Sequence, residues 1–237
     1  MFIISEIFPQ HSGNLLVAEQ MILQSKLSGA SAVKMQLYPD NMFSNDGIDR
    51  SYLTLSFESL KNLTEYSNKI GISIFATAFT METLEWCMEL KFPYLKIPSR
   101  MHKENPDLID KIYSKDKDVF VSVPENLSLN EIQKSKKAKY LYCVSKYPTL
   151  LEDINLPDFS KDEYVGFSDH SIGIAAALFA ASKGCEILEK HFTISKALQK
   201  SSEKAHLGGM DENDLKSIYN LSNEFKLIGK KPKKISV

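Results

Sequence analysis

Eight short apolar segments alternate along the chain with longer amphipathic segments, and this alternation predicts parallel strands joined by helices. The expected strands are Phe2–Ile7, Ser31–Leu37, Ile72–Thr77, Tyr94–Pro98, Val119–Val123, Tyr140–Val144, Tyr164–Ser168 and Glu186–His191. The expected helices are Leu15–Leu27, Phe57–Lys69, Met81–Leu90, Pro106–Tyr113, Leu129–Ser135, Ile172–Ser182 and Glu212–Leu227. Within 237 residues, eight such units are most economically closed into a single (β/α)8 TIM barrel.

Local signals sharpen these boundaries. Gly29, Gly71 and Gly184 each follow a helical segment at the point where a left-handed residue ends a helix, and Ser128 with Glu131 has capping-box spacing. The connection 149–162 shows no convincing long helix, and 38–56 is expected to be a long loop. An open doubly wound sheet is the alternative, but neither GxGxxG nor GxxxxGK[ST] follows the first strand.

Charge and cysteine content exclude several classes of protein. The 29 basic residues nearly balance the 30 acidic ones, so no net field favours nucleic acid or an anionic membrane. The three cysteines lie in apolar segments without CxxC spacing, which disfavours a disulfide framework or a zinc knuckle. No apolar run is long enough to span a bilayer, and a cytoplasmic location is expected. We expect one barrel domain over 1–230 and a basic tail or truncated linker over 231–237.

Polar side chains gather at the carboxyl ends of the expected strands, and a barrel would place them on one face. They are Glu6, Lys34, Gln36, Thr77, Lys96, Ser99, Ser122, Ser145, Tyr147, Ser168, His170, Glu189 and His191. Two lysines among several hydroxyls suit a small polyanion such as a phosphorylated carboxylate. Two histidines beside carboxylates suit a divalent transition metal.

Each of these groups also has an ordinary structural explanation. A single histidine at a strand end is more often a hydrogen-bonded structural residue than a ligand, but His170 and His191 end neighbouring strands, each with an acid one or two residues before it. Lys34 and Lys96 lie within the apolar segments AVKMQL and YLKIPS, and a buried lysine is rare unless it is paired or functional. The isolated hydroxyls carry little information alone. His102 and His206 are expected to be loop residues.

A series of distinctive segments runs along nearly the whole chain. They are SEI followed by QHSGN, GASAVKMQLY, IFATAF, YLKIPS, VFVSVPENLSLNEI, YCVSKYPT, GFSDHSIGI and EILEKHFT. In these segments and in their order, the chain resembles the barrel domain of the sialic acid synthases, enzymes that condense phosphoenolpyruvate with an amino sugar. The SDHS and EKHFT pair is the most specific part of the resemblance.

The resemblance implies a role for each candidate residue. His170 and His191 match ligands of a catalytic Mn²⁺ or Mg²⁺ ion, and Glu6 matches an acid beside it. Glu189 precedes the second of these histidines within the EKHFT segment and is a further candidate catalytic acid. Gln36 and Tyr147 match the sugar side. The phosphoenolpyruvate positions match Lys34, Thr77, Lys96, Ser99, Ser122 and Ser168, and Ser145 falls at a further substrate-binding position.

The chain departs from the family at three places. Ser145 stands where the family usually has Asn, and the family's acidic position after EKHFT falls on Ser202, next to Glu203. The family continues into an antifreeze-like domain that contributes an arginine to the partner subunit's site, whereas this sequence ends at Val237. A homodimer and a separate antifreeze-like chain are the partners to consider.

Three functions remain open. The first is metal-dependent condensation of phosphoenolpyruvate with N-acetylmannosamine or another aldose, which releases phosphate and forms a 3-deoxy-2-ulosonic acid. The second is a class I aldolase that uses Lys96 or Lys34 as a Schiff base. The third is a non-catalytic or partner-dependent barrel in a surface-sugar pathway. The intact histidine and lysine pairs favour an enzyme.

Overall fold

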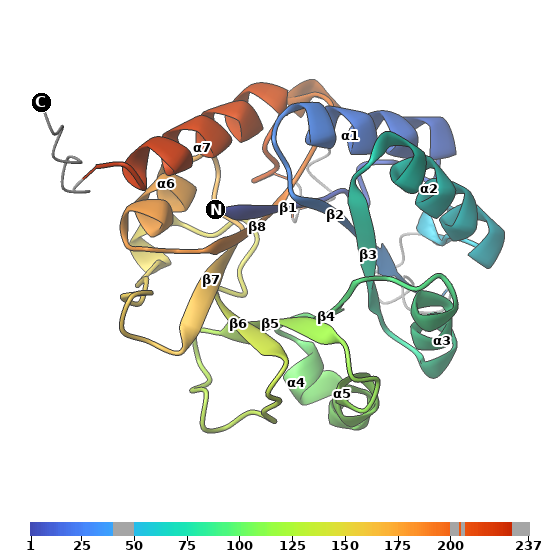
Figure 1. Cartoon of the computed structure of the whole chain (residues 1–237), viewed down its shortest axis with the longest axis horizontal. Helices are drawn as coiled ribbons and strands as arrows, with labels where there is room; N and C mark the ends of the chain where they lie inside the picture. Colours follow the sequence, from blue (N-terminus) through green and yellow to red (C-terminus); the bar gives the residue numbers. More distant parts are fainter. Residues whose placement is uncertain (40–49, 200–203, 205–206, 229–237) are drawn as a thin grey trace, which may run out of the picture.

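The computed structural model describes residues 1–39, 50–199, 204 and 207–228, and its eight parallel strands close into a barrel in sequence order. Figure 1 shows the ring of strands with helices around its outside. The strands are β1 Phe2–Glu6, β2 Ala32–Leu37, β3 Ser73–Ala78, β4 Tyr94–Ile97, β5 Asp118–Pro124, β6 Ala138–Cys143, β7 Tyr164–Asp169 and β8 Ile187–His191. The predicted (β/α)8 barrel and all eight predicted strands are therefore confirmed.

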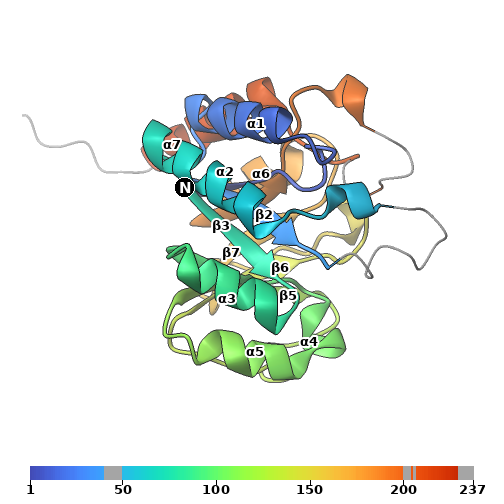
Figure 2. The ribbon, with the colours of Figure 1, turned by 90° about the vertical axis from the view of Figure 1, so that its right-hand side faces the viewer.

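The helices cover the outer surface of the barrel unevenly. In Figure 2, α1 and α2 lie on one side of the strands, and α3 and α5 lie on the other. The connections on either side of β6 contain no α-helix. The helices are α1 Leu15–Leu27, α2 Phe57–Ile70, α3 Met81–Glu89, α4 Met101–Glu104, α5 Pro106–Tyr113, α6 Ala175–Ser182 and α7 Glu212–Phe225.

Side-chain caps set most of the helix starts. Asn14 accepts hydrogen bonds from the backbone N–H groups of Leu16 and Val17 at the start of α1, which satisfies donors that have no partner inside the helix. Thr80 and Thr83 form a reciprocal capping box at the start of α3. At the end of α2, Gly71 adopts φ 76°, as its position in the sequence predicted.

One predicted helix is wrong. Residues 129–135 form turns and bends, although the segment was expected to be helical. Half of the predicted capping arrangement is present, because the Ser128 N–H donates to the Glu131 carboxylate at 2.7 Å. Only Leu129 and Ile132 pack on the core, and the lysine-rich residues that follow offer no further apolar side chain to bury. Because helices in proteins depend mainly on packing of an apolar face, the segment stops after one turn.

The barrel interior is apolar at one end and charged at the other. Side chains alternate between the two faces of a strand, so Phe2, Ile4 and Glu6 of β1 share the inward face. The ring of Phe120 lies 5.7 Å from that of Phe2 and 5.1 Å from that of Tyr94. This aromatic layer fills the amino-terminal end, and the charged residues therefore collect at the carboxyl-terminal end, where TIM-barrel active sites lie.

The structure also bears on disulfide bonds and membrane-spanning helices. All three cysteines, Cys87, Cys143 and Cys185, are buried and free. No helix in the described part of the chain has the length and apolar character required to cross a membrane.

Gly166 of β7 faces the crowded barrel interior, and we predict that Gly166→Ala destabilises the protein. An added Cβ would lie 2.5 Å from the Ile187 carbonyl oxygen and 2.9 Å from a methyl group of Leu141. The Ile187 backbone belongs to β8 and cannot yield without disturbing the barrel. We expect a loss of roughly 1–3 kcal/mol in the free energy of unfolding, measured by urea denaturation.

Gly173→Ala is a comparison without crowding: no atom lies within 4 Å of its added Cβ, and its φ of 78° adds a backbone cost of roughly 1–2 kcal/mol. A Gly166→Ala protein as stable as the wild type would contradict the predicted crowding.

Candidate active site

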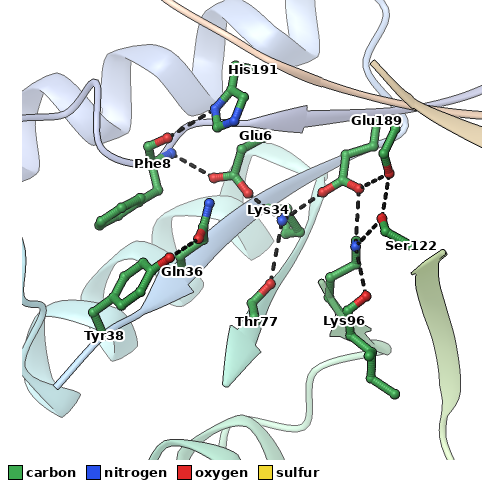
Figure 3. Close-up of polar contacts among 12 residues, drawn as sticks. Glu6, Phe8, Lys34, Gln36, Tyr38, Thr77, Lys96, Ser122, Glu189 and His191 are labelled. Atoms are coloured by element: carbon green, nitrogen blue, oxygen red, sulfur yellow. Dashed lines mark hydrogen bonds and ion pairs between the residues drawn. The ribbon is translucent and has the colours of Figure 1, made fainter. Parts of the chain in front are cut away.

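Lys34 is the centre of a buried ion-pair network at the carboxyl-terminal end of the barrel. Its ammonium group lies 2.5 Å from a Glu6 carboxylate oxygen and 2.7 Å from a Glu189 oxygen. It also contacts the Thr77 hydroxyl at 3.4 Å. The Lys34, Glu6 and Glu189 side chains are 4%, 2% and 9% exposed. Figure 3 shows Lys34, on β2, between the carboxylates of Glu6 on β1 and Glu189 on β8, the two strands that follow it around the barrel.

Lys96 extends the same network across the barrel. Its ammonium group donates to the Ser122 hydroxyl at 2.7 Å and lies 3.4 Å from the second Glu189 oxygen. The Ser122 hydroxyl contacts the Ser168 hydroxyl at 2.6 Å, and Ser168 donates to Glu189 at 2.7 Å. Glu189 therefore holds both lysines and a serine. The sequence prediction that Lys34, Thr77, Lys96, Ser122, Ser168, Glu6 and Glu189 share one face is borne out by these contacts.

Burial and the ion pairs shift the pKa values in opposite directions. Burial opposes charge on Glu189, but Lys34 and Lys96 outweigh it and hold the pKa of Glu189 below its usual range. For Lys34, burial is outweighed by Glu189 and Glu6, which raise its pKa. Burial dominates at Glu6, whose pKa is raised despite Lys34, and at Lys96, whose pKa is lowered despite Glu189. Glu6 and Lys96 are therefore the network members closest to losing their charges.

His170 and His191 lie beside this network at the ends of β7 and β8. Their ring centres are 6.1 Å apart. The Tyr147 ring lies 4.1 Å from that of His170 and 6.4 Å from that of His191. Phe8 links His191 to the ion pairs, because its N–H donates to Glu6 and its carbonyl contacts His191 (Figure 3). The structure therefore brings the predicted pair together with Tyr147.

The two histidines offer nitrogen ligands in a consistent orientation. Nδ1 of His170 lies 2.9 Å from the Val144 carbonyl oxygen, and Nδ1 of His191 lies 3.2 Å from the Phe8 carbonyl oxygen. A carbonyl only accepts, so each Nδ1 carries a proton and the lone pair of each neutral ring is on Nε2. This is the arrangement in which metal-binding histidines are usually held. Among the described residues, no group of three or more His, Cys, Asp or Glu side chains is placed to hold a metal.

Gln36, which was predicted to lie on the sugar side, belongs to a cluster with Tyr38 and Arg100 that sequence reasoning missed. The Tyr38 hydroxyl donates to the side-chain amide oxygen of Gln36 at 2.8 Å and accepts from Arg100 at 2.5 Å. The Arg100 guanidinium lies over the rings of Tyr38 and Phe79, which are themselves stacked at 4.2 Å. Arg100 directly follows the YLKIPS segment, but nothing in its spacing signalled this stacking.

The other predicted residues lie nearer the rim. Ser145 donates to the Ser99 hydroxyl at 2.8 Å, so these two form a pair separate from the Lys96 contacts. His102, expected in a loop, lies in α4 and its Nε2 contacts the Ser122 carbonyl oxygen at 3.0 Å. Ser202, Glu203 and His206 lie outside the described residues.

His11 is a further buried residue that the sequence analysis quoted within QHSGN without assigning a role. Its Nδ1 accepts a hydrogen bond from the Gly13 N–H at 3.0 Å, so its neutral ring carries the proton on Nε2. The side chain is fully buried, and Nε2 has no hydrogen-bond partner within the described part of the chain. Burial lowers the pKa of His11 to about 4.

Comparisons with known proteins identify relatives over most of the chain. The sequence profile of the NeuB family matches residues 21–233. A pseudaminic acid synthase of Campylobacter jejuni is 31% identical over 87% of this chain and 69% of that protein. An N,N'-diacetyllegionaminic acid synthase of Legionella pneumophila is 28% identical over 92% of this chain and 70% of that protein.

A solved structure agrees with the sequence matches. The N-acetylneuraminic acid (sialic acid) synthetase from Leptospira borgpetersenii, in complex with citrate, superposes with a TM-score of 0.87 at 28% identity. The match covers 98% of this chain and 86% of that one. The barrel therefore has a fold already known in a synthetase.

We predict that His11→Asn flattens the dependence of stability on pH. The folded protein binds the His11 proton with a pKa of about 4, whereas the unfolded chain binds it near 6.5. Between pH 4 and pH 6.5, the unfolded state therefore binds more protons than the folded state. The contribution of His11 to the free energy of unfolding is complete above pH 6.5 and is lost as the pH falls toward 4. Asn keeps an acceptor for the Gly13 N–H but does not titrate.

Urea denaturation at pH 7 and pH 4.5 measures this effect. The wild type should lose roughly 2–3 kcal/mol more than His11→Asn over this range. Parallel stability curves for the two proteins would show that His11 is not held neutral by burial.

Proposed function

The chain belongs to the NeuB family, and on this premise we propose that it condenses phosphoenolpyruvate with an aldose to form a 3-deoxy-2-ulosonic acid of the nonulosonate class, releasing phosphate. The relatives named above are synthases of pseudaminic, legionaminic and N-acetylneuraminic acids. The observation that carries the proposal is the pair of buried lysines joined through Glu189 beside two histidines.

The lysines and hydroxyls would bind phosphoenolpyruvate. Lys34 and Lys96 supply two positive charges within a region closed to solvent, where charge-assisted hydrogen bonds are strong. Thr77, Ser122 and Ser168 add directed hydroxyl groups for carboxylate and phosphate oxygens.

Phosphoenolpyruvate would have to compete with the carboxylates that now hold the lysines. In the substrate-free network, Lys34 and Lys96 are balanced by Glu6 and Glu189. An entering anion adds negative charge, which favours protonation of the carboxylate that ionises least readily. Glu6 is that group, because burial already raises its pKa. Of the two carboxylates, Glu6 would therefore be the first to take up a proton if one accompanies substrate binding.

The histidines fit a divalent cation, Mn²⁺ or Mg²⁺, bound through Nε2 of His170 and His191. Such an ion, when bound, supplies Lewis-acid polarisation of the aldehyde oxygen of the open-chain sugar. The Val144 and Phe8 carbonyls fix the two ring orientations. Tyr147, stacked near His170, and Gln36 would then border the acceptor sugar.

The proposed reaction makes one carbon–carbon bond and breaks one phosphate-ester bond. C3 of phosphoenolpyruvate attacks the aldehyde carbon, and the resulting oxocarbenium centre at C2 takes up water. Loss of phosphate from C2 then leaves the ketone of the 3-deoxy-2-ulosonic acid. The substrates are phosphoenolpyruvate, aldose and water, and the products are the ulosonic acid and phosphate.

A class I aldolase is the second candidate, because burial lowers the pKa of Lys96 and so favours the neutral amine that a Schiff base requires. Borohydride would trap a pyruvyl adduct on Lys96 in that case, and activity would survive a chelator. The contacts of Lys96 with Glu189 and Ser122 favour the condensing enzyme, since they hold the amine as a charged donor.

The proposed function predicts that the protein releases phosphate from phosphoenolpyruvate in the presence of Mn²⁺ only when an acceptor sugar is added. EDTA should abolish this release. A panel of N-acetylmannosamine, its 6-deoxy diamino relatives and simple aldoses identifies the acceptor. His170→Ala and His191→Ala should each abolish turnover without unfolding the protein, whereas the surface variant Lys134→Ala should not. Full activity in both histidine variants would exclude the metal role.

The second prediction separates the two substrates. Lys96→Met keeps the length of the side chain but removes the ammonium group, and Glu189 retains Lys34 as a partner. We expect the KM for phosphoenolpyruvate to rise about 10–100-fold, the effect of losing a hydrogen bond to a charged group. The KM for the sugar should change little. Equal changes in both constants would contradict the assignment of Lys96 to phosphoenolpyruvate.

A further inference from the structure

Asp169 and Lys190 form a fully buried ion pair immediately before the two histidines in the sequence. The Lys190 ammonium lies 2.8 Å from an Asp169 oxygen, and both side chains are 0% exposed. The two residues are also paired in the register between β7 and β8. Because Ser168 and Glu189 face the barrel interior, Asp169 and Lys190 face outward, behind the wall that carries the site.

We propose that this pair is a positioning device that fixes the His170 ring and, with it, the geometry of the two-histidine site. Its role toward a metal rests on the proposed function, but the positioning of His170 does not. Neither Asp169 nor Lys190 touches the interior network, so both act through the backbone that follows β7.

The contacts of the pair converge on Ser171. Asp169 accepts from the Ser171 N–H at 2.8 Å and from its hydroxyl at 2.7 Å. Lys190 donates to the Ser171 carbonyl oxygen at 2.6 Å. Both the N–H and the C=O of the residue after His170 are thus bonded to the same ion pair. A pair that only stabilised the barrel wall would not need to hold this loop residue at both ends.

Two further contacts complete the support of His170. Its carbonyl oxygen accepts from the Thr149 N–H at 3.0 Å, and its ring is bonded to the Val144 carbonyl. The segment 208–210 lies beside the backbone of both histidines. Its Met210 N–H donates to the His191 carbonyl oxygen at 2.8 Å. In that segment, a Cβ at Gly208 would lie 2.8 Å from the His170 carbonyl oxygen.

Removing only one charge would leave the other buried and unpaired, which could unfold the protein. The test therefore uses Asp169→Leu/Lys190→Met, which removes both charges and retains side-chain volume. Asp169→Asn/Lys190→Gln keeps neutral groups able to hydrogen-bond Ser171. Gly208→Ala crowds the His170 backbone without changing any charge. Glu85→Leu/Lys115→Met removes both charges of a partly exposed ion pair, 2.6 Å long, as the control.

The first readout is the ring ¹H–¹⁵N spectrum of ¹⁵N-histidine-labelled protein without metal or substrate. The wild type should show His170 as the Nδ1–H tautomer. Asp169→Leu/Lys190→Met and Gly208→Ala should convert it to a mixture of tautomers, while His102 is unchanged. Asp169→Asn/Lys190→Gln and the control pair should retain the wild-type spectrum. An unaltered His170 spectrum in a folded Asp169→Leu/Lys190→Met protein would overturn the proposal, and Gly208→Ala decides the question if that protein does not fold.

The second readout is Mn²⁺ affinity by electron paramagnetic resonance, again without substrate. Loss of an outer contact to a metal ligand typically weakens binding 10–100-fold, and we expect about this change for Asp169→Leu/Lys190→Met. Unchanged affinity would refute the role toward the metal. A wild type that binds no Mn²⁺ would contradict the proposed function instead, and the ring spectrum would still decide whether the pair positions His170.

Discussion

The pairing of both interior lysines with Glu189 is the interaction on which the polar end of the barrel depends. An unpaired ammonium group in this buried interior would carry a desolvation cost of several kcal/mol. Glu189 offsets that cost for Lys34 and Lys96 together, and Glu6 completes the balance. Under the proposed function, the site therefore keeps two positive charges for an anionic substrate without destabilising the barrel. The same balance means that such an anion would compete with Glu6 and Glu189 for the two lysines.

The closed barrel converts this charge balance into a site because it brings distant segments to one end. Glu6 and His191 are partners in the register of β1 and β8, although they lie at opposite ends of the sequence. The aromatic layer around Phe120 fills the amino-terminal end of the barrel, so the polar groups lie at the carboxyl-terminal end. Outside the wall, Asp169 and Lys190 tie the ends of β7 and β8 together. On β7 and β8, Ser168 and Glu189 thus face the barrel interior, and the ion pair that supports the site faces outward.

Sequence reasoning was most successful where a local pattern was repeated or unusual. The period of the apolar segments predicted all eight strands, and lysines inside apolar strands marked Lys34 and Lys96 as residues needing partners. It failed at 129–135, where a capping signal was present but too few apolar side chains followed to pack a helix. It also missed Arg100 and His11, because their significance lies in contacts with Tyr38, Phe79 and Gly13 rather than in their own spacing.

By itself, the sequence determined the barrel, the end at which the polar residues gather and most of their identities, because strand period and strand-end chemistry are local properties of the chain. Only the tertiary structure decided which residues are partners. The sharing of Glu189 between two lysines, the hydrogen bonds that orient both imidazoles, and the outward ion pair behind them join residues up to 183 positions apart. Such contacts depend on strand register and barrel closure, which bring backbone atoms of one segment within hydrogen-bond distance of side chains from another.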